Sequence, residues 1–300
     1  MKLPDEDIAV PDIAKAFAVQ LDVADKLFEY VSAMMNGVRF ASTQNIHSCV
    51  APVLTRLLRL HYATVKLASV GLASEAKMPV RATFENVVNL YALELSPDRE
   101  EYARRWIAWD LVNFMKQVEA EIRLHPHNEP LFAEHKRIAG TVEREIREEA
   151  AAEALARWPT DAARRETFVD GRWRVFKSHG PSMKDMRALS QEVDGKTNPK
   201  TNFSTSYDFI YPNASGVVHG SDLSSLVEQT ATQIVVKLAP TPDWIETVLN
   251  SSNIWLMMGA ASAARVLKIG AEDAGTQMEA MVRPSVAHLL DRVAGPAGGP

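Results

Sequence analysis

Cysteine is almost absent from this chain of 300 residues, and its scarcity indicates where the protein works. Cys49 is the only cysteine, so no disulfide can form within the chain. Residues 1–7 lack the basic and apolar regions of a secretory signal. Both features favour a reducing cytoplasm as the location.

Long apolar runs and common catalytic signatures are also missing. The longest apolar stretch, residues 254–264, is far shorter than the ~20 residues that a membrane span needs. A net charge of −5 argues against a general nucleic-acid coat, although a local basic pocket is compatible with it. The sequence holds no glycine-rich phosphate loop, no Gly-x-Ser-x-Gly and no His-Glu-x-x-His, so three large enzyme classes lack their signature.

Helical periodicity dominates what is present. Apolar residues recur at spacings of three and four, and 46% of the chain is hydrophobic. We expect an all-α multi-helix array of about nine or ten helices. They would form a single helical domain over residues 12–293, after a flexible arm at 1–11 and before a disordered tail at 294–300. A polar stretch at 195–202 is the candidate for an internal boundary.

Two segments show competing signals. Asp170-Gly171 is a turn dipeptide between apolar residues, so the pattern allows a small β-hairpin near 168–176. After Ser221, apolar residues at helical spacing predict an amphipathic helix that runs to Leu238.

A long apolar helix is expected after Pro242. It would run to about residue 269, and its apolar surface exceeds what one buried face needs. One interpretation is therefore a helical oligomerisation scaffold built on this segment.

Two polar columns at a spacing of four residues form the candidate site. The first comprises Arg81, Glu85 and Asn89, and the second comprises Tyr207, Tyr211, Ser215 and His219. Residues four apart lie nearly above one another on a helix. Because buried charged groups need partners, two such columns would meet either as an internal clamp or as an active site. Pro212 interrupts the second column, so we expect a helix to about Ile210 and a new turn that ends near His219.

Each member of the candidate site has an expected role. His219 precedes Gly220 at a predicted helix end and would act as acid and base. Tyr207 and Tyr211 would orient it, and Glu85 would be an orienting carboxylate.

Three further residues would bind the ligand. Arg81 would hold an anion, while Asn89 and Ser215 would provide hydrogen bonds. The alternatives are a helix cap for His219, and an ordinary ion pair or a buried clamp for Arg81 and Glu85.

Two weaker patterns are compatible with chance. An arginine followed five residues later by histidine, a spacing found in some helical ribonucleases, occurs at Arg56–His61, Arg174–His179 and Arg283–His288. With eight histidines in the chain, one or two such matches are expected at random. His125, His127 and His135 make only a weak metal pattern, so we assign no metal and no cofactor.

The order of motifs resembles a known family. An "EA…R…E…N" helix carries the first column, a segment with Trp173 and a short helix over 182–189 follow, and a "Y…S…HGS" helix ends at Ser221. Over about residues 57–238 this order resembles an uncharacterised bacterial family, the domain of unknown function five-six-seven-seven. That family is all-α and is similar to the HEPN helical proteins, many of which are RNA-cleaving toxins or defence factors. The chain departs from the HEPN signature, because residues 212–214 stand where its arginine would lie.

The resemblance implies a cytoplasmic bacterial protein that acts as a binding or defence-associated module. It would form a homo-oligomer, with RNA or a nucleotide as its ligand and no membrane partner. The alternatives are a metal-independent ribonuclease or nucleotide-modifying toxin that uses His219, and the oligomerisation scaffold described above.

Overall fold

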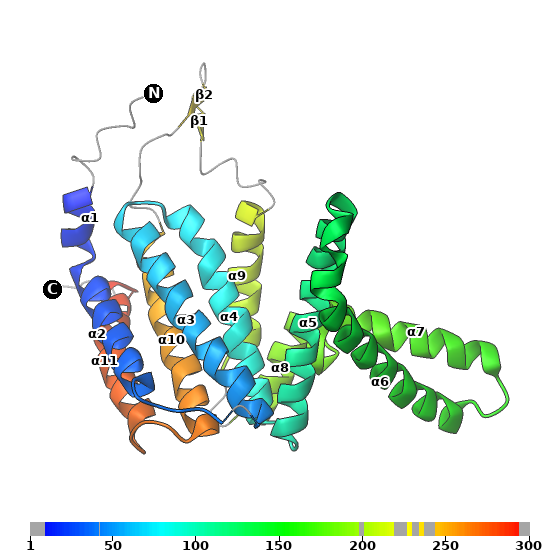
Figure 1. Cartoon of the computed structure of the whole chain (residues 1–300). Helices are drawn as coiled ribbons and strands as arrows, with labels where there is room; N and C mark the ends of the chain where they lie inside the picture. The colour runs from blue at the N-terminus through cyan, green and yellow to red at the C-terminus, as the bar shows by residue number, and fades with distance from the viewer. Residues whose placement is uncertain are drawn as a thin grey trace.

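The computed structural model describes residues 10–41, 43–197, 201–218, 227–229, 234–236 and 244–293. Within these residues the chain forms eleven α-helices, two 3-10 helices and one two-stranded sheet (Figure 1). This confirms the all-α prediction. No helix of this described part is long and apolar enough to cross a membrane.

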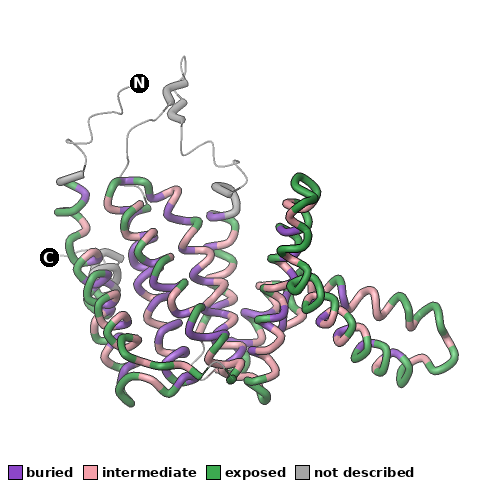
Figure 2. Tube along the Cα trace, viewed as in Figure 1, coloured by how far each residue is buried: buried purple, intermediate pink, exposed green. Residues whose placement is uncertain are grey.

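The main body is a bundle built around one central helix. That helix is α10 (Ile245–Leu267), and it packs against α2 (Ala18–Met35), α3 (Asn45–Ser69), α4 (Ala73–Glu94) and α11 (Ala274–Val293). Fifteen of its 23 residues are buried, and Figure 2 shows that buried residues are more frequent in the bundle than in the projecting helices α6 and α7. The helices approach closely at Gly259, where an added Cβ would lie 2.5 Å from Leu57 Cδ1.

The central position of α10 explains its apolar surface. A helix that is apolar all round is typical of one that is surrounded by other helices. Four helices of the same chain cover α10, so its composition no longer supports the prediction of an oligomerisation scaffold.

A short pair of helices completes the bundle beside α4. These are α8 (Met186–Lys196) and α9 (Phe203–Val218). Phe203 is fully buried and packs edge-on against Phe84 and Tyr91, with ring centroids 6.1 and 5.1 Å away. Asp194, at the end of α8, accepts hydrogen bonds from the backbone N–H groups of Phe203 (2.7 Å) and Ser204 (2.8 Å) and so caps α9.

Pro212 does not end the helix that contains it. The expectation of a break near residue 210 is wrong, because α9 continues to Val218 with Pro212 inside. A proline removes one backbone hydrogen bond and its ring crowds the preceding turn. The packing of α9 on α4 and α8 offsets that cost, so the second polar column stays regular as far as the structure describes it.

A helical arm projects from the bundle (Figure 1). It comprises α5 (Arg99–Leu124), the 3-10 helix η1 (Pro126–Phe132), α6 (Ala133–Arg157), α7 (Ala162–His179) and the 3-10 helix η2 (Gly180–Ser182). The arm has a small core of its own, made of Ala108, Val112, Val142, Ile146, Trp173 and Phe176.

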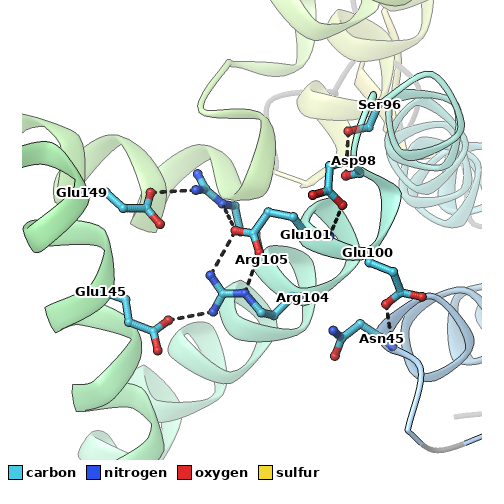
Figure 3. Close-up of polar contacts among 9 residues, drawn as sticks. All are labelled: Asn45, Ser96, Asp98, Glu100, Glu101, Arg104, Arg105, Glu145 and Glu149. Carbon is cyan, nitrogen blue, oxygen red and sulfur yellow. Dashed lines mark hydrogen bonds and ion pairs between the residues drawn. The ribbon is translucent and has the colours of Figure 1, made fainter. Parts of the chain in front are cut away.

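Ion pairs fasten α5 to α6 at the base of the arm (Figure 3). Glu101 accepts from both Arg104 (2.7 Å) and Arg105 (2.6 Å). The same two arginines reach α6, at Glu145 (2.7 Å) and Glu149 (2.6 Å). The hydrogen bond from Arg104, helped by Arg105, lowers the pKa of Glu101 to about 2, so this carboxylate stays ionised at neutral pH.

The hairpin expected near 168–176 is absent, because this segment lies inside α7. Asp170 and Gly171 are helical there, despite their preference for turns. The Asp170 carboxylate accepts from Arg147 Nη1 of α6 at 2.6 Å. Trp173 and Phe176 of the same helix are buried in the core of the arm, and this packing overrides the local turn signal.

Near residue 230 the structure has strands where the sequence predicted a helix. The amphipathic helix expected from Ser221 to Leu238 is wrong in its middle, where β1 (Val227–Gln229) pairs antiparallel with β2 (Ile234–Val236). Its β-branched residues suit strands as well as helices.

The ends of the chain lie mostly outside the described residues. The flexible N-terminal segment was predicted to extend over residues 1–11, yet Val10 and Pro11 already belong to α1 (Val10–Ala16). The tail at 294–300 is outside the described part. The boundary proposed at 195–202 stays a prediction, and the Asp194 cap ties the two helices that flank it.

Candidate functional site

The two polar columns face each other across α4 and α9. Tyr211 contacts Arg81 near the start of α4, whereas Phe203 contacts Tyr91 near its end. The two helices are therefore antiparallel, and Tyr207 lies level with the middle of the first column.

Arg81 and the two tyrosines form a three-layer stack. The Arg81 guanidinium carbon lies 3.8 Å from the centroid of the Tyr211 ring. The Tyr207 ring stacks on Tyr211 with centroids 4.5 Å apart and planes 26° from parallel. A ring has only two faces, so neighbours this close must occupy opposite sides of Tyr211.

Glu85 completes the first column electrostatically. Its Oε1 accepts from Arg81 Nε at 3.0 Å, and the two side chains are 20% (Arg81) and 35% (Glu85) exposed. Burial acts to lower the pKa of Arg81, but the hydrogen bond to Glu85 and the nearby Tyr211 outweigh it, so the pKa is raised. Burial and the Glu85 charge raise the pKa of Tyr211. Arg81 thus stays charged and Tyr211 stays a neutral phenol at physiological pH.

The two asparagines of α4 that line the cleft, Asn86 and Asn89, hold their amide nitrogens against the helix backbone. Asn86 Nδ2 donates to the Ala82 carbonyl (2.6 Å), and Asn89 Nδ2 donates to the Glu85 carbonyl (2.8 Å). A backbone carbonyl only accepts, so the nitrogen of each amide must face it. Each Oδ1 atom therefore remains an available acceptor.

Arg81, Glu85 and Asn89 of the first column and Tyr207 and Tyr211 of the second line one cleft with a volume of about 520 Å³. The bundle contributes Arg56, Arg81, Glu85, Asn86, Asn89, Met186, Leu189, Tyr207 and Tyr211. The arm and the loop after it contribute Trp106, Trp109, Asp110, Ser178, His179, Lys184 and Asp185. The cleft therefore lies where the arm joins the bundle.

The cleft holds cations in different states of pairing. Arg56 is exposed and has no hydrogen-bond or ion-pair partner among the described residues. Lys184, in contrast, donates to Glu192 at 2.6 Å. Arg56 is therefore the cation most available to an incoming anion.

His179 reaches the cleft because of the way α7 ends. It is the last residue of that helix, and Gly180 follows with φ +69°. A Cβ on Gly180 would lie 3.0 Å from Trp109 Cδ2, so only glycine lets the chain turn this close to the ring. Trp109 Nε1 also donates to the carbonyl of Lys177 at 3.3 Å. These contacts hold the end of α7, and with it His179, at the cleft wall.

The structure brings together most of the predicted site residues. Arg81, Glu85, Asn89, Tyr207 and Tyr211 all line the cleft.

The other two predicted site residues are described only in part or not at all. Ser215 lies in α9, but its side chain is outside the described part, and so is all of His219. Their roles stay predictions.

Sequence reasoning missed eleven members of the cleft, among them Arg56, Trp109, Asp110 and His179. The argument that favoured His219, a histidine at a helix end before glycine, applies equally to His179. The Arg174–His179 spacing was a second signal, yet Arg174 does not line the cleft and bonds weakly to the Asp170 carbonyl (3.4 Å).

The two residues of the Arg56–His61 match lie in different environments. Arg56 lines the cleft, whereas His61 is buried, with Nδ1 2.8 Å from Ser252 Oγ and Nε2 3.2 Å from the Ala24 carbonyl. Burial lowers the pKa of His61, so its ring is neutral and structural.

The histidines near η1 lie away from this cleft. His125 and His127 pack edge to face, with centroids 5.9 Å apart, and His135 packs against Phe114. Among the described residues no three side chains of His, Cys, Asp or Glu cluster as metal ligands.

Comparison with known protein families decides the classification. A family of unknown function, DUF5677, matches residues 47–232, which is more than half of the chain. The chain belongs to this family. Every residue that lines the cleft falls within the DUF5677 region, whereas α10 and α11 lie beyond it.

The family assignment confirms the resemblance inferred from the sequence. The bacterial origin and the similarity to HEPN proteins stay predictions. No curated protein and no solved structure matches the chain.

Proposed function

We propose that this member of DUF5677 is a binding module for a nucleotide or a segment of RNA, and that the ligand lies in the cleft between the bundle and the arm. The observation that carries the proposal is the convergence of the described members of both polar columns with Arg56 and His179 on one cleft of about 520 Å³. That volume lies within the range that suits small ligands, roughly 300–1,000 Å³.

The chemistry of the cleft wall supports this ligand class. An unpaired guanidinium such as Arg56 suits a phosphate, which it can bind with two parallel hydrogen bonds. Stacked tyrosines suit the flat face of a base. Acidic groups such as Asp110 and Glu85 make the cleft mixed in charge, which favours a short, specifically placed ligand over a long polyanion.

A matched pair of arginines tests the proposal. Arg56 and Arg59 are both exposed on α3, but only Arg56 lines the cleft. We expect Arg56→Ala to weaken binding of a fluorescent five-nucleotide RNA about 10-fold in anisotropy titrations, because a charge-assisted hydrogen bond is lost. Arg59→Ala removes the same charge and should change the affinity less than about 2-fold. Equal effects of the two substitutions, or no binding by the unmodified protein, would contradict the proposal.

A second candidate function is metal-independent RNA cleavage. The observation that favours it is His179, an exposed histidine at the wall of the same cleft. In such a reaction the 2′-oxygen attacks the adjacent phosphorus and the bond from phosphorus to the 5′-oxygen breaks. The products are a 2′,3′-cyclic phosphate and a 5′-hydroxyl. His179 would accept the proton of the 2′-hydroxyl or supply one to the 5′-oxygen.

Histidine variants distinguish cleavage from binding. If His179 is the acid or base, His179→Ala should lower RNA cleavage in EDTA at least about 100-fold while RNA affinity stays within 2-fold. His127→Ala, in η1, is the control, and His219→Ala tests the residue predicted from sequence. Absence of cleavage by the unmodified protein would leave the binding module as the function.

A further inference from the structure

A second cavity, with a volume of about 310 Å³, adjoins the cleft. Lys184 and Leu189 line both, so the two hollows meet at these residues. The cavity lies between the end of α4, the start of α5 and one face of α8, where Tyr102 and Glu192 also border it. A ligand in the cleft can therefore extend one further group past Lys184.

Three charged side chains border this cavity among the described residues. Lys184 Nζ donates to Glu192 Oε2, and Lys196 Nζ donates to Glu192 Oε1, each at 2.6 Å. These two hydrogen bonds lower the pKa of Glu192, so the carboxylate and both ammonium groups are charged at neutral pH. Two positive groups and one negative group leave the cavity with an excess of positive charge.

The two ammonium groups converge on one point. Because they bind different oxygens of a single carboxylate, their nitrogens lie no more than about 7.5 Å apart. Each ammonium group has three N–H donors, and Glu192 takes one from each. The oxygens of one phosphate can reach both nitrogens with hydrogen bonds of about 2.8 Å.

The serine hydroxyls of the wall are already engaged. Ser96 Oγ donates to the Asp98 carbonyl at 2.9 Å, and Ser182 Oγ lies 3.3 Å from the carbonyls of His179 and Lys184. Apolar walls exclude water and strengthen the attraction between a cation and an anion. The cavity therefore favours an anionic acceptor over a neutral donor. Its apolar lining residues are Ala92, Leu95, Pro97, Pro181, Leu189 and Val193.

We propose that this cavity is a second anion subsite, in which Lys184 and Lys196 bind a second phosphate group of the ligand while Arg56 binds the first. This inference rests on the proposed nucleotide-binding function and adds that the ligand carries two phosphates. Glu192 is a positioning residue, because it holds both ammonium groups at the cavity. A nucleoside diphosphate and an RNA strand with phosphates on both sides of a ribose share this chemistry.

Calorimetric titrations of the full-length protein compare AMP with ADP and with adenosine 3′,5′-bisphosphate. Each of the last two ligands adds one phosphate to AMP, either on the 5′-phosphate or on the 3′-oxygen. We expect at least one of them to bind about 10-fold more tightly than AMP, because the added phosphate gains charge-assisted hydrogen bonds. A gain with ADP alone identifies a nucleoside diphosphate, and a gain with the 3′,5′-bisphosphate alone identifies an RNA-like strand.

A matched pair of lysines separates the subsite from the cleft. Lys196 lines the cavity but not the cleft, so Lys196→Ala should remove the gain and leave the affinity for AMP within about 2-fold. Lys136→Ala is the control and should keep the gain. The side chains of Lys136 and Lys196 are both 48% exposed, and each donates to a glutamate at 2.6 Å, but Lys136 lies in α6.

Replacing the carboxylate tests the sign of the effect. Glu192→Gln keeps both lysines and removes the negative charge between them, so the second phosphate should bind more tightly than in the unmodified protein. A purely structural role of Glu192 would instead weaken the binding of all three ligands. Circular dichroism melts check that each variant is folded.

The outcomes distinguish this inference from the function on which it rests. Equal affinities for AMP, ADP and the 3′,5′-bisphosphate, with Arg56→Ala still weakening the binding of AMP, would overturn the subsite and keep the proposed function. A gain that survives Lys196→Ala would also overturn the subsite, since the second phosphate would then lie elsewhere. If neither the nucleotides nor RNA bind, the proposed function fails and the subsite fails with it.

Discussion

Replacing Asp194 by alanine should destabilise the protein more than the loss of an ordinary helix cap. Its carboxylate is the hub between α8 and α9 and is almost completely buried, with the residue 9% exposed. Besides the two backbone groups described above, it accepts from Thr201 Oγ1 and Ser204 Oγ, each at 2.7 Å. Asp194→Ala would thus remove the carboxylate that four donors share, and the buried N–H of Phe203 would lose its hydrogen-bond partner.

The magnitude follows from a comparison with Asp161, which caps α7. Asp161 accepts a single backbone hydrogen bond, from Arg164 N at 3.0 Å. Asp161→Ala should therefore cost about 1 kcal/mol, as for a typical cap. Asp194→Ala should cost about 3 kcal/mol, because it removes a charged acceptor and leaves a buried donor unsatisfied. Urea unfolding at pH 7 measures both free energies.

The pH dependence gives the prediction a second test. Burial acts to raise the pKa of Asp194, but the hydrogen bonds from Ser204, Thr201 and Phe203 outweigh it, so the pKa is lowered in the folded state. A carboxyl group with a lowered folded-state pKa stabilises the protein fully above its unfolded value of about 3.9. That contribution is lost as the pH falls through the folded-state pKa. The free energies of unfolding of Asp194→Ala and of the unmodified protein should therefore differ least at the lowest pH.

Two results would refute this reasoning. One is a loss of stability by Asp194→Ala that is no larger than that of Asp161→Ala. The other is an equal deficit at pH 7 and at pH 3.

Three further predictions concern other parts of the chain. His61 has a lowered pKa because it is buried, so the unfolded chain binds a proton first; stability should fall as the pH drops below about 6.5, and His61→Gln should remove that slope in thermal melts. Gly180→Ala should cost about 1–3 kcal/mol, since its Cβ would meet the Trp109 ring and φ is positive, whereas Gly171→Ala, with no atom within 4 Å, should stabilise α7 by up to about 1 kcal/mol; urea unfolding compares them. Light scattering tests the predicted homo-oligomer, and a monomeric mass would contradict it.

Much of the fold was predictable because the signals for a helix lie in residues that are close together in the sequence. The apolar spacing predicted the all-α class, and the spacing of four residues placed Arg81, Glu85 and Asn89 on one face of α4. These signals depend on residues within one or two turns of each other. They hold wherever the rest of the chain lies.

Two of the errors share a cause. Asp170-Gly171 favours a turn on its own but is helical because α7 packs Trp173 and Phe176 into the core of the arm. Pro212 favours a break but lies inside α9, which packs on two neighbours. In both cases contacts between distant segments contribute more free energy than the local preference costs.

The cleft shows what the sequence alone determined and what only the tertiary structure decided. The sequence alone determined most of the helices and the spacing of the two polar columns, since each follows from the geometry of a single helix. Tertiary structure decided that the columns face one cleft and that Arg56 and His179 join them, more than 120 residues apart along the chain. Side chains so far apart in sequence meet only when α3, α4, α7 and α9 are packed together, and no local periodicity records which faces of different helices will touch.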